Sequence, residues 1–296
     1  MTDISSLAGP LVNGILWGGL FALIGMGLSL VFGVMNLINV AHGDLVILGT
    51  YFAFFLSTGL VLRQDLPIAM DPILSLVIVM PVMFGLGFAI QKLLLNRAFT
   101  VSAEAPLIIA FGISLIIQNT ALKLWSPMSR SLTPPYALDV FVTGPLRIRL
   151  VYVIAFVAAL IMVFLLREFL RRTYLGRAIS ATAQNKKASH LMGINTSRVY
   201  SFAFAIAMAV SAVAGVCLGL IFSFTPQKGI QFLIIAFGVV IIGGLGSMVG
   251  TLVGGIIMGL VMTFGGFFLN LHWQMLLLYL IVIVVLAARP QGIFGR

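Results

Sequence analysis

The sequence contains few charged residues and almost no cysteine. Charged residues make up 8% of the 296 residues, and Asp and Glu together number 7. Soluble domains carry roughly a quarter charged residues, so a chain this apolar cannot cover a water-facing surface. The single cysteine, Cys217, lies in an apolar run, which excludes a disulfide framework and a cysteine-based metal site.

Two motifs of nucleotide and metal chemistry are also missing. The chain has no G-x-x-x-x-G-K-[ST] phosphate loop and no Gly-Lys pair. Its three histidines, His42, His190 and His272, are far apart and form no His-Glu-x-x-His zinc motif. We therefore expect no metal, no cofactor bound by this chain and no enzymatic activity.

Apolar residues dominate what is present. They make up 61% of the chain, and the mean hydropathy is +1.19. At roughly 20 residues per membrane helix, this length allows about eight to ten spans. Only helices or closed barrels satisfy their backbone in lipid, and the runs do not alternate, so we predict an all-α transmembrane bundle of about 8–9 spans. The apolar runs cover 10–34, 37–62, 73–93, 106–125, 150–170, 199–222, 230–243, 248–269 and 273–288.

Basic residues gather in loops, although the net charge of +10 alone would be compatible with nucleic-acid binding. Asp44 is the only acid or base between Ile4 and Leu62, and Lys228 is the only one between Val199 and Ala288. This distribution favours a membrane protein whose cytoplasmic loops are basic. We expect no nucleic-acid partner and a multi-pass protein of the cytoplasmic (inner) membrane.

One loop sets the predicted orientation. The segment 167–198 should be cytoplasmic, because Glu168 is its only acid and its basic residues are Arg167, Arg171, Arg172, Arg177, Lys186, Lys187 and Arg198. Counting from this loop gives an external N-terminus, a cytoplasmic C-terminal tail and nine crossings. The run 230–243 is short enough to be a half-helix that breaks inside the membrane.

We predict one transmembrane domain over residues 1–296 with two long loops. The cytoplasmic loop spans about 171–198, and an external loop spans about 126–149. Proline fixes turns, so the external loop should be ordered. Its prolines are Pro127, Pro134, Pro135 and Pro145.

Polar residues interrupt the first apolar block between residues 33 and 44. They are Asn36, Asn39, His42 and Asp44. Polar groups at membrane depth are costly unless they are paired or face a cavity. Two interpretations remain open: a broken helix that lines a translocation path or its gate, or a short turn in which His42 and Asp44 form a helix cap and its neighbour.

Small residues interrupt the second apolar block. They are Gly243, Gly244, Gly246 and Ser247. Glycine lets the backbone leave helical geometry, and serine can satisfy the freed groups. Paired interruptions in two halves point to the central site of a transporter and to an internal repeat. We therefore include these four residues in the candidate path.

The cytoplasmic loop predicts one or two short helices. It is too polar to span the membrane, it is rich in alanine, and Gly193 can end a helix. Ala178, Ala181, Leu191 and Met192 offer an apolar side, and Lys186 and Lys187 a charged one. The alternative is a linker that lies on the membrane surface.

Four motifs resemble those of the branched-chain amino acid permeases of ATP-binding cassette (ABC) importers. They run from Gly27 to Asp44, from Gly176 to Gly193, from Gly243 to Gly255 and from Arg289 to Gly295. The resemblance covers nearly the whole chain. Relatives that serve urea, short amides and other amino acids share much of the pattern.

The resemblance implies a permease subunit that moves branched-chain or similar small amino acids by alternating access. It implies cytoplasmic ATPase subunits that use ATP, a second homologous permease and a periplasmic binding protein as partners. In that family the cytoplasmic loop docks into a cleft of the ATPase. Carried to this chain, the coupling residues are Arg177, Ala181, Ala183, Gln184, Asn185, Lys186, Lys187 and Gly193.

Two other functions compete with this one. A permease for urea or short amides would share the family pattern. An ion-coupled secondary transporter would need membrane-buried acids, and Asp44 is the only such acid in either long apolar block. Dependence on ATP rather than on an ion gradient separates an ABC permease from an ion-coupled secondary transporter.

Overall fold

The computed structural model describes residues 4–61, 64–65, 70–102, 104–143, 146–269, 273–289 and 292–294. Helices form nearly all of this part of the chain, as the apolar runs predicted. The first half contains α1 (Ile4–Met35), α2 (His42–Thr58), α3 (Leu76–Ile90) with the π-helical turn η1 (Gln91–Leu95) and α4 (Asn96–Ala98), α5 (Ala105–Trp125) and α6 (Leu150–Arg172). The second half contains α7 (Tyr174–Gln184), α8 (Lys186–Leu191), α9 (Thr196–Ile221), the turn η3 (Pro226–Lys228), α10 (Gly229–Gly243), α11 (Met248–Phe268) and α12 (Gln274–Ala288).

Seven helical stretches among the described residues are long and apolar enough to cross a membrane. They comprise α1, α3 with its extension, α5, α6, α9, α10 with η3, and α11. Two shorter helices, α2 with 17 residues and α12 with 15, fall in the remaining apolar runs. The prediction of a polytopic helical bundle is therefore confirmed.

The helices α1 and α9 form the centre of the bundle. In the most apolar 18-residue stretch of each helix, 78% of the residues are buried in α1 and 83% in α9, against 22% in α3 and in α5. Glycines permit the closest approach, because a Cβ on Gly18 of α1 would lie 2.5 Å from the Ile256 Cα of α11. The outer helices expose apolar side chains, which is the pattern expected of a surface in lipid.

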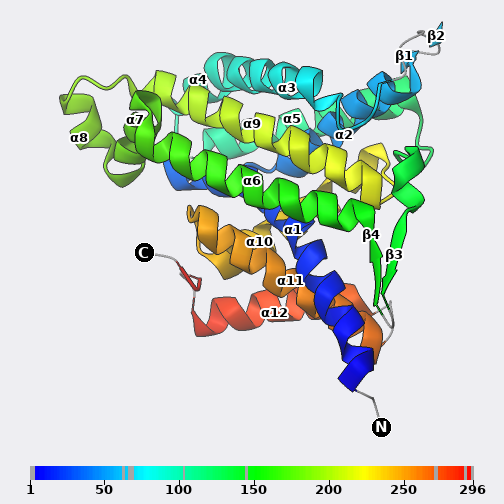
Figure 1. Cartoon of the computed structure of the whole chain (residues 1–296). Coiled ribbons are helices and arrows are strands. Elements are labelled where there is room, and N and C mark those ends of the chain that lie inside the picture. The colour runs from blue at the N-terminus through cyan, green and yellow to red at the C-terminus, as the bar shows by residue number, and fades with distance from the viewer. Residues whose placement is uncertain are drawn as a thin grey trace.

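The two halves of the chain are built alike but run in opposite directions. The helix α1 packs along α11 as α9 packs along α3, and α2 lies on α9 as α10 lies on α1. The helix α2 contacts α5 as α10 contacts α12. Figure 1 shows α1 running toward the end of the bundle that carries α7 and α8, while α9 runs away from it. We infer an inverted repeat of α1, α2, α3 and α5 against α9, α10, α11 and α12.

The two ends of the bundle differ in charge. The helices α4, α7 and α8 and the end of α6 lie at one end, and the hairpin of β3 (Val140–Thr143) and β4 (Leu146–Arg149) lies at the other (Figure 1). The first end carries Lys92, Arg97, Arg167, Arg171, Arg172, Arg177, Lys186, Lys187 and Arg198. By the positive-inside rule it faces the cytoplasm.

The external segment 126–143 is ordered around a short helical turn, η2 (Pro135–Leu138). Arg130 and Phe224 exchange backbone hydrogen bonds of 3.0 and 2.8 Å, which tie this segment to the stretch after α9. Pro145 lies outside the described residues. The short pair β1 (Leu60–Val61) and β2 (Gln64–Asp65) lies at the same external end (Figure 1).

Candidate functional site

The helix α2 begins in the interior of the bundle rather than at its cytoplasmic end. After α1 ends at Met35, residues 36–41 run back along it. His42, the first residue of α2, is buried, and its Nε2–H donates to the carbonyl oxygen of Ile24 at 2.8 Å. Ile24 lies about three turns before the end of α1, a rise of roughly 16 Å. The segment is thus a re-entrant turn that ends near the middle of the bundle.

The helix α10 also begins in the interior, and its first residue meets the first turn of α2. A Cβ on Gly43 would lie 1.9 Å from the Gly229 carbonyl oxygen, and a Cβ on Gly229 would lie 1.9 Å from Oδ1 of Asp44. Only glycine fits at either position. The N-termini of two helices, each with a partial positive charge, therefore converge on the Asp44 carboxylate.

Asp44 is buried and links α2 to α5. The Ser114 hydroxyl donates to Oδ2 at 2.5 Å, and the Gln118 side-chain amide donates to Oδ1 at 3.0 Å. Ser114 and Gln118 are one helical turn apart on α5, so both can reach the same carboxylate. These donors and the two helix N-termini offset the cost of a carboxylate at membrane depth. We call Asp44, Ser114, Gln118 and Gly229 the polar junction.

The turn before α2 is held by local hydrogen bonds, but two of its buried side-chain nitrogens have no described partner. Asn39 Oδ1 accepts the Ala41 N–H at 3.2 Å, and the Asn39 carbonyl accepts the His42 N–H at 3.1 Å. Among the described residues, Asn39 Nδ2 and His42 Nδ1 are buried without a hydrogen-bond partner. The predicted helix cap is wrong, because the N-cap residue of α2 is Ala41, which makes no side-chain cap bond, and the His42 and Asp44 side chains bond to α1 and α5 instead. The role of this segment in a path stays a prediction.

Asn36 lies apart from the polar junction. It is exposed, with φ of 51°, where α1 ends at the cytoplasmic side. It lines a cavity of about 370 Å³ together with Gln184, Lys186, Phe99 and Tyr200. The structure places Asn36 beside the predicted coupling loop and not beside Asp44.

Gly243, Gly244, Gly246 and Ser247 form the turn between α10 and α11. Gly244 and Gly246 have φ of 98° and 82°, and Ser247 Oγ accepts the Gly250 N–H at 3.0 Å to cap α11. Gly246 packs on Gly33 near the end of α1, so this turn lies at the cytoplasmic end. The segment that corresponds to 36–41 in the inverted repeat is therefore 222–228, and not 243–247 as the sequence suggested.

Sequence reasoning missed three members of the polar junction. Ser114 and Gln118 stand four positions apart in a largely apolar run, and that spacing was the available signal. Gly229 gave no signal, because only the crossing of α2 and α10 makes a side chain impossible there. His272 lies outside the described residues. No cluster of His, Cys, Asp or Glu in the described part of the chain could hold a metal ion.

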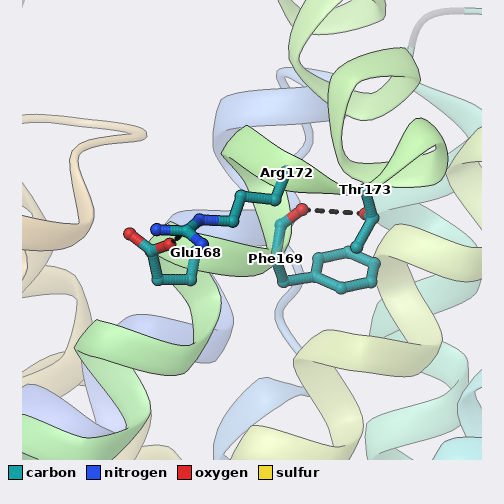
Figure 2. Close-up of polar contacts among 4 residues, drawn as sticks. All are labelled: Glu168, Phe169, Arg172 and Thr173. Carbon is teal, nitrogen blue, oxygen red and sulfur yellow. Dashed lines mark hydrogen bonds and ion pairs between the residues drawn. The ribbon is translucent and has the colours of Figure 1, made fainter.

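The predicted coupling loop starts with a tight corner between α6 and α7. Figure 2 shows the Thr173 hydroxyl donating to the Phe169 carbonyl at 2.8 Å and Glu168 paired with Arg172. Thr173 Oγ1 also accepts the Gly176 N–H at 2.9 Å, which caps α7. A Cβ on Gly176 would lie 2.1 Å from the Phe169 carbonyl oxygen, so the corner requires glycine.

The loop then forms two short helices, as predicted. Asn185 Oδ1 accepts the Ala188 N–H at 3.0 Å and caps α8. Gly193, with φ of 79°, ends α8 through bonds from its own N–H to His190 and from Ile194 N–H to Ser189. This is the Schellman arrangement expected of a terminating glycine.

The four residues that were predicted to form one apolar side of the loop differ in their exposure. Ala178 is buried against the bundle and Ala181 is half-buried, whereas Leu191 and Met192 are 86% and 83% exposed. They do not form one apolar side, because α7 and α8 are separate helices. The exposed predicted coupling residues are Arg177, Ala183, Gln184, Asn185, Lys186, Lys187 and Gly193.

Lys186 is engaged within the chain. Its Nζ lies 5.4 Å from the ring centroid of Tyr200 and 5.8 Å from that of Phe99. Such cation–π contacts are worth about 0.5–1 kcal/mol at exposed sites. Lys186 therefore helps hold α8 against α9, while Lys187 projects from an exposed position.

We expect Asp44→Ala to destabilise the protein strongly and to abolish transport. The substitution leaves the buried Ser114 hydroxyl without its acceptor, at about 1–3 kcal/mol, and removes one of the two acceptors of the half-buried Gln118 amide. Thermal unfolding in detergent and substrate uptake measure the two effects. Asp139→Ala, in the exposed external segment, is the matched control and should leave both unchanged. Equal stability of the two variants would show that the junction is not a structural link.

Comparisons with known proteins point to one family over nearly the full length of this chain. The sequence model described as "Branched-chain amino acid transport system / permease component" matches residues 11–286. The chain is 32% identical over 305 residues to the high-affinity branched-chain amino acid transport system permease protein BraD of Pseudomonas aeruginosa, covering 100% of this chain and 98% of that protein.

Two proteins of Escherichia coli K12 also match. Identity to the high-affinity branched-chain amino acid transport system permease protein LivH is 29%, covering 96% of this chain and 94% of LivH. Identity to LivM, a permease protein described in the same words, is 24%, covering 93% of this chain and 67% of LivM. No solved structure matches the chain.

Proposed function

This chain belongs to the family of permease components of branched-chain amino acid transport systems, and from that premise we propose that it moves branched-chain amino acids inward through an ATP-driven importer. It is a multi-pass subunit of the inner membrane and a transport protein rather than an enzyme. The observation that carries the proposal is the match to BraD and LivH over nearly the whole of all three chains.

We propose that energy comes from ATPase subunits on the cytoplasmic side. The chain has no phosphate loop of its own, so ATP is used by the partner. The short helices α7 and α8 stand at the basic end of the bundle, and their capped ends fix a compact shape. The exposed end of α7 and the start of α8 are our proposed contact with the ATPase.

We propose a periplasmic binding protein and a second, homologous permease as the other partners. The similarity of this chain to both LivH and LivM of one organism supports a pair of related permeases. The names of the relatives support leucine, isoleucine and valine as substrates. Urea or short amides are the alternative within the family.

Reconstitution tests this function directly. The chain is assembled in proteoliposomes with its ATPase subunits, second permease and binding protein, and labelled leucine, isoleucine, valine and urea are offered. We expect uptake of the three amino acids that requires ATP and persists when ionophores collapse ion gradients. Uptake driven by an ion gradient without ATP would contradict the proposal, and uptake of urea alone would select the alternative.

A further inference from the structure

Polar side chains are exposed on one face of the bundle beside the polar junction. Asn119 and Thr120 lie on α5, next to Gln118, and Gln227 and Gln231 lie on either side of Gly229. All four are exposed. The turn η3 packs against α5, so these residues belong to neighbouring elements. We call them the amide strip, after the carboxamides of its three Asn and Gln members.

The amide strip lies at membrane depth. The helix α5 has 21 residues, a length of about 30 Å, and Asn119 lies roughly 6 Å from its midpoint. The hydrocarbon core of a bilayer is about 30 Å thick, so this position is well inside it. Gly229 touches Asp44, which is bonded to Gln118, and this contact places Gln227 and Gln231 at a similar depth.

Lipid is a poor environment for this face. Asn119 donates one amide hydrogen to the Leu115 carbonyl at 2.7 Å, but a carboxamide has a second hydrogen and an acceptor oxygen to satisfy. The exposed side chains midway along α6 are apolar instead, as a lipid-facing surface requires: Val157, Leu160, Ile161 and Phe164. Amides at this depth indicate a face that meets water, solute or protein.

We propose that the amide strip lines the substrate path and faces the second, homologous permease across it. This inference rests on the proposed function. Gly112 lies on α5 seven residues before Asn119, on the same face, and the space around it lets another backbone approach closely. This chain is similar to both LivH and LivM of one organism, which supports a related permease as the protein that faces the strip.

The chemistry of the strip suits a small zwitterion with an aliphatic side chain. Carboxamides donate to a carboxylate and accept from an ammonium group without carrying charge themselves. Leu115, Ile230 and Ile234 are exposed beside them and offer apolar contact. The strip therefore recognises both parts of a branched-chain amino acid in passage.

Cysteine labelling of the assembled transporter tests the path. In a Cys217→Ala background, Asn119→Cys and Gln231→Cys are treated with a small, charged methanethiosulfonate that reacts only in water. Ile161→Cys, exposed among apolar side chains midway along α6, is the lipid-facing control. We expect labelling at the strip to be at least about tenfold faster, because an apolar environment raises the thiol pKa and removes reactive thiolate. Excess leucine should slow labelling at the strip alone.

Two further readouts identify the occupant and separate the hypotheses. A photo-cross-linker on Asn119→Cys should form an adduct with the second permease, whereas adducts only with lipid would overturn the proposal. Labelling as slow as at Ile161→Cys, in a complex whose uptake still requires ATP, would overturn the strip and leave the proposed function intact. Rapid labelling with uptake that ignores ATP would overturn the function and leave the path intact.

Discussion

Gly229→Ala destabilises the fold and abolishes transport. The added Cβ would lie 1.9 Å from Oδ1 and 2.9 Å from the Cα of Asp44, so α2 and α10 must separate to admit it. Overpacking of this kind costs about 1–3 kcal/mol, and here it also disturbs the bonds from Ser114 and Gln118 to Asp44. Thermal unfolding in detergent and leucine uptake in proteoliposomes measure the loss.

Gly85→Ala on α3 is the matched control. It makes the same chemical change in a helix, but apart from the adjoining backbone of α3 no described atom lies within 4 Å of the added Cβ. Because alanine favours a helix over glycine by up to about 1 kcal/mol, this variant should be as stable as the parent or slightly more so. If both variants unfold at the same temperature, the close crossing of α2 and α10 is wrong.

Ala183→Trp uncouples transport from ATP hydrolysis. Ala183 is exposed near the end of α7, two residues before the Asn185 cap of α8. If this short helix seats in a cleft of the ATPase, as we propose, an indole ring there would block the seating. A clash worth more than about 1.4 kcal/mol lowers occupancy of the docked state tenfold, and we expect uptake to fall at least that far. Uptake and ATPase activity are measured on the same preparation.

Lys186→Ala and Lys187→Ala are the controls for charge. The first loses two exposed cation–π contacts and the second an exposed charge, and each such interaction is worth only about 0–1 kcal/mol. Both variants should retain most of their uptake. A loss as large as that of Ala183→Trp in either lysine variant would show that charge, rather than the fit of the helix, holds the ATPase.

The local features of the coupling loop were predictable from a few residues. Gly193 marked the end of α8, and the alanine-rich stretch marked α7, because helix termination and helix propensity act within one or two turns. The division of the apolar side chains was not predictable. Ala178 became buried because the Thr173 corner turns α7 back onto the bundle.

The sequence predicted a possible internal repeat, and the repeat inferred from the helix contacts pairs different segments. The glycines at 243–247 signalled backbone freedom, which serves a cytoplasmic turn as well as a break inside the membrane. In the inferred repeat the counterpart of 36–41 is 222–228, whose sequence carries Pro226 and Ser223 and no glycine run. A run of glycines indicates where the backbone can bend, but it does not indicate how deep in the membrane the bend lies.

The sequence by itself determined that this chain is a helical membrane protein, which of its loops are basic and where its short helices end. Each of these properties depends only on residues that are close together along the chain. The surroundings of Asp44 came from tertiary packing alone. Its partners Ser114 and Gln118 are 70 and 74 residues away along the chain, and the amide strip beside them arises where α5 meets η3, the turn just before α10. Which polar groups meet inside the bundle is set by the crossing of helices, and that geometry depends on side chains too distant in sequence for a local pattern to reveal.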